Sequence, residues 1–215
     1  MIITTNRFLS SPIRWLLVSA FVLLLGFGGI TSLSASSQEI ERREARVQAT
    51  YLTHLITFTR WSQDHLPKQG KLPTILILGS EQNGFVASLK YLLSQRNIKI
   101  GGVAARLFHF ENPKSANGME AIKSGAQVVF IMPDCPLDIK NIRKISPSAV
   151  IFGFGRGFVT QKGGDVSFIS SHNRVKLILS ENYFRRTSPK LSAKIANLKS
   201  VVEIIKNRAA RSSTE

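Results

Sequence analysis

Apolar and polar positions follow a helical spacing near the start of the chain. Over residues 38–65 apolar side chains recur every three or four positions, which predicts one long helix with a single apolar stripe. The stripe consists of Val47, Tyr51, Leu52, Leu55, Ile56 and Phe58. Pro67 and Gly70 end the helix, and its stripe must pack against another part of the chain.

Short apolar runs then alternate with amphipathic segments. The runs 74–79, 127–131 and 149–152 are typical of strands that are buried on both faces of a sheet. Further strands are predicted over residues 98–100 and 103–110, around a Gly101-Gly102 turn. Helices are predicted over residues 80–94, over 114–124, and from Pro136 to Pro147. This rhythm predicts a mostly parallel α/β sheet with helices on both faces.

The C-terminal part breaks the rhythm. Residues 166–169 and 175–179 are joined by the polar turn 170–174, which predicts a β-hairpin. A final helix is predicted over residues 190–206, with apolar positions at Leu191, Ile195, Leu198, Val201, Val202 and Ile205. The fold class is therefore α/β: a single domain over residues 38–207, with a C-terminal β-hairpin plus helix, followed by a disordered basic and polar tail over residues 208–215.

The first 37 residues have a different composition. Arg7 and Arg14 precede an apolar run over residues 15–30, which leads into small polar residues. This order is that of a secretory signal peptide, although the run is long enough that an N-terminal membrane anchor stays open. Small residues at Ser34 and Ser36 favour cleavage, so we expect the mature chain to begin between Ser34 and Gln38. In either case the remainder is exported.

Composition and charge narrow the classes of function. Of the 215 residues, 43% are hydrophobic and 20% are charged, which supplies a sizeable core and excludes intrinsic disorder over most of the chain. The net charge of +16 would suit nucleic acid, but export argues against that partner. An anionic membrane surface or an acidic surface on a membrane partner fits better, and a solvated basic surface without function stays open.

No catalytic constellation, metal site or cofactor site is predicted. Cys135 is the only cysteine, so an intramolecular disulfide and a thiolate metal cage are both excluded. The acids Asp134 and Asp138 flank it and oppose formation of a thiolate, which indicates a structural cysteine. The four histidines are His54, His65, His109 and His172. No two of them have the spacing of metal ligands on a predicted helix, and the sequence places no carboxylates nearby to complete a site.

Glycines follow one predicted strand. Residues 153–157 come after a strand as a phosphate-binding loop would, but the pattern predicts no helix directly after them, which favours a simple turn. Gly163 and Gly164 are predicted to turn the chain into the next strand, with at least one of them at positive φ. The alternative is that these glycines directly approach a ligand or a partner backbone.

An ordered set of motifs extends over residues 45–205. It comprises Tyr51-Leu52 with Phe58 and Trp61, the runs 75–79 and 128–131, Gly157-Phe158 with Gly163-Gly164 before residues 166–168, and the segments 174–177 and 191–195. This set resembles the YfiR family. The resemblance implies a bacterial periplasmic protein that binds and inhibits the sensory region of a membrane diguanylate cyclase, thereby lowering cyclic-di-GMP signalling. It implies a non-catalytic regulator without a cofactor.

The chain also departs from the family pattern. Gln127 stands where the family has a cysteine, and Arg60 and Ser62 flank Trp61 in place of an acid and a proline. Ile178 and Ser180 stand where the family has an acidic residue and an asparagine. The resemblance implies partner contacts on this strand at Lys176, Ile178 and Ser180, and a structural motif formed by Tyr51, Phe58, Trp61, Gly157, Gly163 and Gly164.

Other assignments stay open at this point. The partner is a membrane diguanylate cyclase or another inner-membrane sensor, and a homodimer is compatible with the sequence. The alternative function is a periplasmic small-molecule-binding protein of the α/β type. Its ligand would lie at the carboxyl ends of the parallel strands, near Gly79, Pro133 and Gly153.

Overall fold

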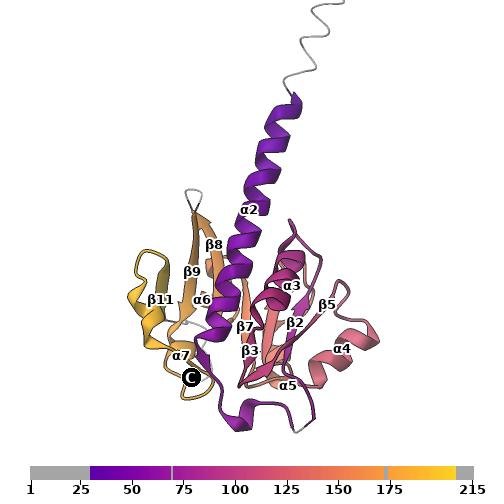
Figure 1. The fold of residues 1–215 in the computed structure, drawn as a ribbon, viewed down its shortest axis with the longest axis vertical. Helices are drawn as coiled ribbons and strands as arrows, with labels where there is room; N and C mark the ends of the chain where they lie inside the picture. Colours follow the sequence, from indigo (N-terminus) through magenta and orange to yellow (C-terminus); the bar gives the residue numbers. More distant parts are fainter. Residues whose placement is uncertain (1–29, 69, 172–173, 207–215) are drawn as a thin grey trace, which may run out of the picture. The chain divides into compact units, whose positions relative to one another are not determined.

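The computed structural model describes residues 30–206, except residues 69, 172 and 173 (Figure 1). The chain divides into two units, Met1–Glu41 and Arg42–Glu215. The predicted signal peptide or anchor falls mainly on residues 1–29, which lie outside the described residues, as does the predicted tail over residues 208–215. In the described part of the chain, no helix is long and apolar enough to cross a membrane.

A seven-stranded sheet organises the second unit (Figure 1). Its strand order is β11-β9-β8-β7-β6-β2-β5. The strands are β2 (Thr74–Leu78), β5 (Arg106–Phe110), β6 (Val128–Ile131), β7 (Val150–Phe154), β8 (Val166–Ser171), β9 (Arg174–Ser180) and β11 (Val202–Ile205). All neighbours are parallel except β8 and β9, which pair antiparallel. The mostly parallel α/β sheet and the hairpin are therefore confirmed.

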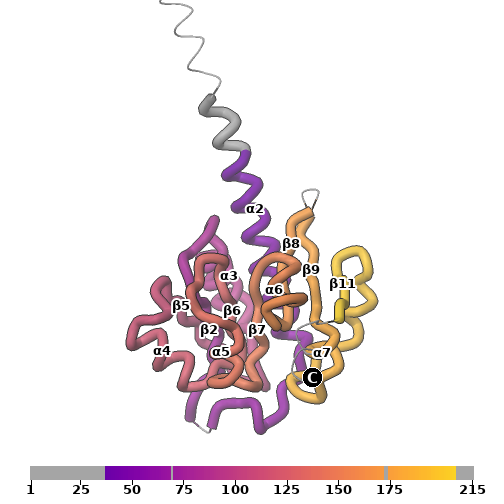
Figure 2. The backbone as a smooth tube through the Cα atoms, turned by 180° about the vertical axis from the view of Figure 1, so that it is seen from behind, coloured from indigo at the N-terminus to yellow at the C-terminus, as the bar shows by residue number. Residues whose placement is uncertain are grey.

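Helices cover both faces of this sheet. On one face, Ile77 and Phe130 pack with residues 42–57 of α2 (Ile30–Thr57) and with α3 (Phe85–Arg96), and we call these helical segments the front layer. On the other face, Leu78 and Val129 pack with the back layer, which consists of α4 (Ala116–Lys123), α5 (Ile139–Ile145) and α6 (Arg156–Thr160). Figure 2 shows the back layer in front of the strands. Because successive side chains of a strand point to opposite faces, one apolar run supplies both layers.

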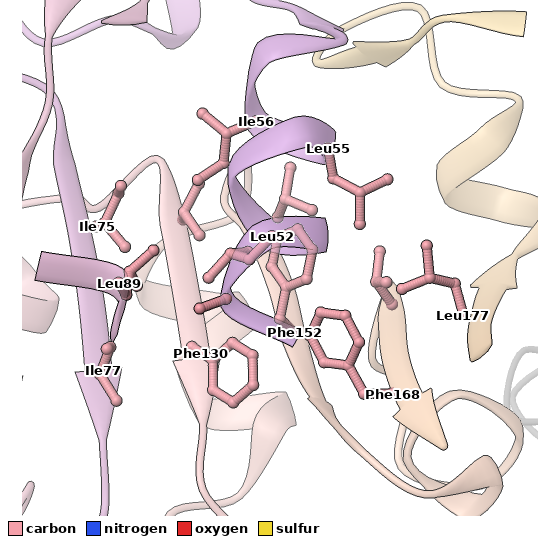
Figure 3. Packing of buried hydrophobic residues seen from close by; sticks show 14 of the residues in the cluster. Leu52, Leu55, Ile56, Ile75, Ile77, Leu89, Phe130, Phe152, Phe168 and Leu177 are labelled. Carbon is pink, nitrogen blue, oxygen red and sulfur yellow. The ribbon is translucent and has the colours of Figure 1, made fainter. Parts of the chain in front are cut away.

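An aromatic cluster fills the space under the front layer (Figure 3). The Phe130 ring lies at its centre, with centroid distances of 4.5 Å to Phe85, 6.4 Å to Phe152 and 5.8 Å to Phe168. Leu52 and other residues of α2 cover these rings. Tilted and offset ring pairs at such distances add to the stabilisation from burial alone.

The first helix ends earlier than its apolar spacing predicts. It stops at Thr57, and the chain continues into β1 (Thr59–Arg60) and the 3-10 helix η1 (Gln63–His65). Strand β1 pairs with β10 (Lys190–Leu191), a contact between distant segments that spacing alone does not show. As a result Phe58 leaves the apolar stripe, and 41% of its surface is exposed.

The predicted final helix is wrong. Residues 190–206 form β10, the 3-10 helix η2 (Ala193–Asn197) and β11 instead. Strand β11 pairs in parallel with β9, where Val202 lies opposite Leu177. This pairing satisfies backbone groups along one side of β9 that would otherwise be free. Apolar residues spaced by three and four positions are compatible with a helix and also with a 3-10 helix followed by a strand. The pairing of β11 with β9 selects the second arrangement.

Smaller differences concern where elements begin. The turn at Gly101 and Gly102 joins β3 (Lys99–Ile100) to β4 (Val103–Ala104), as predicted. Helix α5 begins at Ile139 rather than at Pro136, because the Asp138 carboxylate caps it and accepts the Lys140 N–H at 2.9 Å.

Candidate functional site

The crevice between the ends of β2 and β6 is the topological switch point of the sheet. The chain passes from β2 outward to β5 and then returns to the other side of β2 to form β6. Ligands of open α/β sheets commonly bind at such a point, outside the carboxyl ends of the strands. The residues at this point are Gly79, which follows β2, and Asp134, which lies in the loop after β6.

This crevice is occupied by groups of the chain itself. The Asp134 carboxylate accepts the Ser80 N–H, with distances of 3.1 and 3.0 Å to its two oxygens, and these hydrogen bonds lower the pKa of Asp134. The Nε2 atom of His109 lies 2.8 Å from the Gly79 carbonyl. A Cβ atom on Gly79 would lie 2.6 Å from an Asp134 oxygen, and φ at Gly79 is +108°. Beside Gly79 even a Cβ atom would therefore meet the Asp134 carboxylate.

A cleft lies one strand further along. It has a volume of about 590 Å³ and lies at the carboxyl ends of β6 and β7, beside α5 and α6; we call it the β6/β7 cleft. Its apolar lining includes Met132, Pro133, Pro136, Leu137, Phe154 and Phe158. Its polar lining includes Cys135, Asp138, Lys140, Gln161 and Lys162. Of the three positions where a ligand was expected, only Pro133 lines this cleft.

The Phe158 ring explains why two glycines lie near the cleft. A Cβ atom on Gly153 would lie 2.2 Å from this ring, and one on Gly164 would lie 2.1 Å from it. Any other residue at either position would displace the ring from its place beside the cleft. The neighbouring Gly163 has φ of +82°, which confirms the predicted positive φ in this turn.

The prediction that no helix follows the glycines of residues 153–157 is wrong. Helix α6 begins at Arg156, and Gly155 is its N-cap residue with φ of +77°. Gly157 lies inside this helix. Five residues form only about one turn. A segment this short shows no helical repeat of apolar residues, so the sequence pattern does not predict it. A helix this short provides no phosphate site.

Cys135 lies in the β6/β7 cleft and is half-buried. Burial raises the pKa of its thiol, and the negative charge of Asp134 raises it further. The thiol therefore stays protonated at neutral pH. This agrees with the interpretation of Cys135 as a structural cysteine, because Asp134 opposes the thiolate as predicted.

Three polar side chains form a cluster between η1 and the segment before β10. His65 Nδ1 lies 2.8 Å from Ser62 Oγ and 2.7 Å from Ser188 Oγ. The Gln127 amide joins this region to β2, because it donates to the His65 carbonyl and accepts the Thr74 N–H. No carboxylate of the described residues hydrogen-bonds to the imidazole. The cluster holds the loop in place and does not have the composition of a hydrolytic triad.

The described histidines do not form a metal site. His54 is exposed and stacks on Phe58 at 6.3 Å, while His109 binds a carbonyl as given above. His172 lies outside the described residues. Over residues 30–206, apart from the three omitted positions, no group of three or more His, Cys, Asp or Glu side chains could hold a metal ion.

A buried ion cluster, which the sequence does not reveal, lies at the start of β8. The Asp165 carboxylate forms ion pairs of 2.8 Å with Arg143 and with Arg186, and it also accepts the Ile151 N–H. Asp165 is 2% exposed. The cluster joins α5, β7, β8 and the segment after α7 (Glu181–Phe184). Its partners are 22 and 21 positions away from Asp165, and no short motif links them.

A family model described as YfiR/HmsC-like matches residues 45–199. The chain belongs to the YfiR/HmsC-like family. A comparison with curated proteins finds no match. The match confirms the resemblance drawn from the ordered motifs, and it indicates a regulatory protein of the periplasm rather than a catalyst. It ends before β11, so that strand lies beyond the matched residues.

The predicted partner-binding residues of this family member differ in exposure. Lys176 is exposed on β9, whereas Ile178 is fully buried and Ser180 is 2% exposed. Because β8 and β11 flank β9, this strand has no free edge. The Ser180 hydroxyl caps α7 by accepting the Tyr183 N–H. Of the three predicted partner-binding residues, Lys176 alone presents an exposed side chain in this structure, and the contacts themselves stay a prediction.

Lys176 lies beside a charged pair that the sequence does not reveal. Arg156 of α6 and Glu203 of β11 form a two-pronged ion pair with distances of 2.7 and 2.6 Å. The Arg156 guanidinium lowers the pKa of Glu203 through these hydrogen bonds, and the positive charge of Lys176 lowers it further. These three residues form an exposed surface, which we call the β9/β11 charge cluster.

The residues of the structural motif are distributed over several contacts. Tyr51 and Trp61 are half-buried and pack against the core of the front layer, whereas Phe58 is exposed. The buried Nε1 atom of Trp61 has no hydrogen-bond partner among the described residues. The structural role of Gly164 is to accommodate Phe158, and that of Gly163 is to adopt positive φ.

Proposed function

We propose that this YfiR/HmsC-like protein binds the periplasmic sensory region of a membrane diguanylate cyclase and holds the enzyme inactive. Cyclic-di-GMP signalling then falls. The observation that carries the proposal is the family match over residues 45–199. Shifting a sensor from mostly active to mostly inactive requires the repressor to favour the inactive state by about 5.5 kcal/mol.

Two features of the chain support binding to a charged protein surface. The net positive charge of the chain, to which the predicted signal peptide contributes only Arg7 and Arg14, attracts an acidic partner and raises the rate of encounter. The β9/β11 charge cluster offers three exposed charged groups at one place, of which Arg156 and Glu203 already hold each other in position. Lys176 has no ion pair with a described carboxylate within 4.0 Å, so its ammonium group is available to a partner.

Co-purification tests the proposal. The full chain, cross-linked in its native envelope and isolated under denaturing conditions, should bring down a membrane diguanylate cyclase that mass spectrometry identifies. Deletion of the gene should raise cellular cyclic-di-GMP. Lys176→Glu should reduce the recovered cyclase, while Lys123→Glu, the same change on an exposed residue of α4, should not. Unchanged cyclic-di-GMP after deletion, with no cyclase recovered, would contradict the function.

Export is part of this proposal. We propose that residues 1–37 direct the chain to the periplasm and that the mature chain begins between Ser34 and Gln38. N-terminal sequencing of protein from the native envelope tests this. A start at Met1 would show that the segment is kept as an anchor, and a cytosolic location would contradict export itself.

The β6/β7 cleft favours the alternative function, a periplasmic small-molecule-binding protein. Ligand pockets in proteins typically measure roughly 300–1,000 Å³, and the volume of about 590 Å³ lies in that range. The two functions are compatible, because a regulator that reports a chemical signal needs a ligand site as well as a partner surface.

A further inference from the structure

We propose that the β6/β7 cleft binds a small organic anion that has an apolar, preferably aromatic, body. The site goes beyond the cyclase interaction and does not depend on it, so either can fail alone. Three observations carry the proposal: the hydrogen bonds at the switch point, the composition of the cleft lining and the pairing of its charged groups.

At the switch point between β2 and β6 the chain binds its own groups. Asp134 accepts the Ser80 N–H, and His109 Nε2 lies 2.8 Å from the Gly79 carbonyl. The open space at the carboxyl ends of the strands lies beside β6 and β7 instead. At this edge of a parallel sheet the loops leave the strands and diverge, which is why ligand sites of α/β folds form there.

The lining determines the body of the ligand. Phe154, Phe158, Leu137 and Met132 offer apolar surface, and the neutral thiol of Cys135 adds to it. An inorganic anion would leave this surface in contact with water, whereas an aromatic or aliphatic body would cover it. Helices α5 and α6 are too short to bind phosphate at their N-termini.

The charges determine the head group. Lys140 and Lys162 line the cleft, and neither ammonium group forms an ion pair within 4.0 Å with a carboxylate of the described residues. The carboxylate in the lining, Asp138, accepts the backbone N–H of Lys140, and neighbouring Asp134 accepts that of Ser80. Two lysines thus stand against one carboxylate in the lining, so a carboxylate or sulfonate on the ligand would meet two unpaired ammonium groups and an excess of positive charge.

A pair of dyes separates the two parts of this recognition. The fluorescent sulfonate 8-anilinonaphthalene-1-sulfonate and its uncharged analogue N-phenyl-1-naphthylamine share one aromatic body. We expect saturable binding of the sulfonate to the full chain. The double substitution Lys140→Gln with Lys162→Gln should weaken binding of the sulfonate at least tenfold and that of the uncharged dye less than twofold. Leu137→Asn should weaken both.

Matched controls address the net charge and folding. The double substitution Lys123→Gln with Lys144→Gln removes the same charge from exposed lysines that do not line the cleft, and it should leave both affinities unchanged. Circular dichroism melts of all variants should coincide with the wild type within a few degrees. Equal losses in both double variants would overturn the proposal, because they would show attraction to the overall charge only.

Cys135 locates the bound dye. It is the only cysteine of the chain, so alkylation by N-ethylmaleimide, followed by intact mass, reports on this cleft alone. Saturating sulfonate dye should slow the alkylation at least fivefold in the wild type and have no such effect in the Lys140 and Lys162 double variant. Alkylation that proceeds at the same rate with and without dye would overturn the proposal, because it would place any bound dye elsewhere.

Discussion

The front and back layers cover the same sheet in different ways. The front layer has α3 with 12 residues and a long stretch of α2, and it covers a closed cluster of phenylalanine rings. The back layer has helices of 8, 7 and 5 residues. These short helices leave the β6/β7 cleft uncovered. The same strands supply both layers, and the cleft lies where the short helices α5 and α6 meet the carboxyl ends of β6 and β7.

This difference predicts that the same substitution lowers stability more in the front layer than beside the cleft. A closed aromatic core relaxes only partly around a missing side chain, so truncation of a core residue leaves a cavity that lowers stability. A layer beside a cleft can admit water or shift into the open space. Helix α6 combines two roles on this side, because it carries Phe158 in the cleft and Arg156 in the β9/β11 charge cluster.

The largest expected effect tests the comparison directly, with one chemical change made in each layer. Phe130→Ala should lower the free energy of unfolding by about 4 kcal/mol, because the side chain is fully buried at the centre of the ring cluster. Phe158→Ala should cost about 2 kcal/mol, since its space is continuous with the cleft and can fill with water. Urea unfolding measures both. Equal losses would show that the two layers are equally closed.

The second effect concerns the ion cluster, which links α5 of the back layer to the end of the hairpin. Asp165→Ala should lower the free energy of unfolding by about 3 kcal/mol, because it leaves two partly buried arginines without their carboxylate. Urea unfolding of this variant should be compared with Glu181→Ala, which removes the carboxylate partner of the exposed Arg185. A loss for Asp165→Ala no larger than for this control would show that the cluster does not stabilise the fold.

The third effect separates the two neighbouring glycines. Gly163→Ala should lower stability by about 1–2 kcal/mol through the strain of positive φ, with open space around the new Cβ. Gly164→Ala should cost about 1–3 kcal/mol by overpacking, and it should also displace Phe158 and weaken dye binding in the cleft. Adding Phe158→Leu should recover part of the stability lost in Gly164→Ala but none of that lost in Gly163→Ala. The same response of both variants to Phe158→Leu would contradict the assigned roles.

The smallest effect concerns the exposed ion pair between Arg156 of the back layer and Glu203 of β11. Arg156 lowers the pKa of Glu203 below its ordinary value of 4.5, so the folded state binds this proton less readily than the unfolded state does. The stabilisation is therefore complete above the ordinary pKa and is lost as the pH falls through the lowered value. Urea unfolding of wild type and Glu203→Gln should differ slightly at neutral pH and converge in acid. A gap that widens in acid would show that the sign is wrong.

Local patterns along the chain predict the parallel part of the sheet well. The runs that become β2, β6 and β7 are apolar at nearly every position, because both faces of these strands are covered, and the hairpin of β8 and β9 follows from its polar turn. The order of the motifs identified the family, which the match over residues 45–199 confirms. For the candidate cleft, the sequence predicted its location at the carboxyl ends of the strands but, apart from Pro133, not the residues that line it.

Contacts between distant segments decide the rest. The spacing of Leu198, Val202 and Ile205 suits a helix as well as a strand, and only the free side of β9 makes a strand of Val202–Ile205. In the same way, the first helix ends where β1 pairs with β10. Asp165 forms ion pairs with Arg143 and Arg186, which are distant from it in the sequence. Apolar runs alone are enough to show which strands are buried on both faces of the sheet. The end of α2, strand β11, the ion cluster and the cleft depend on which backbone edges and charges meet in space, so no local pattern predicts them.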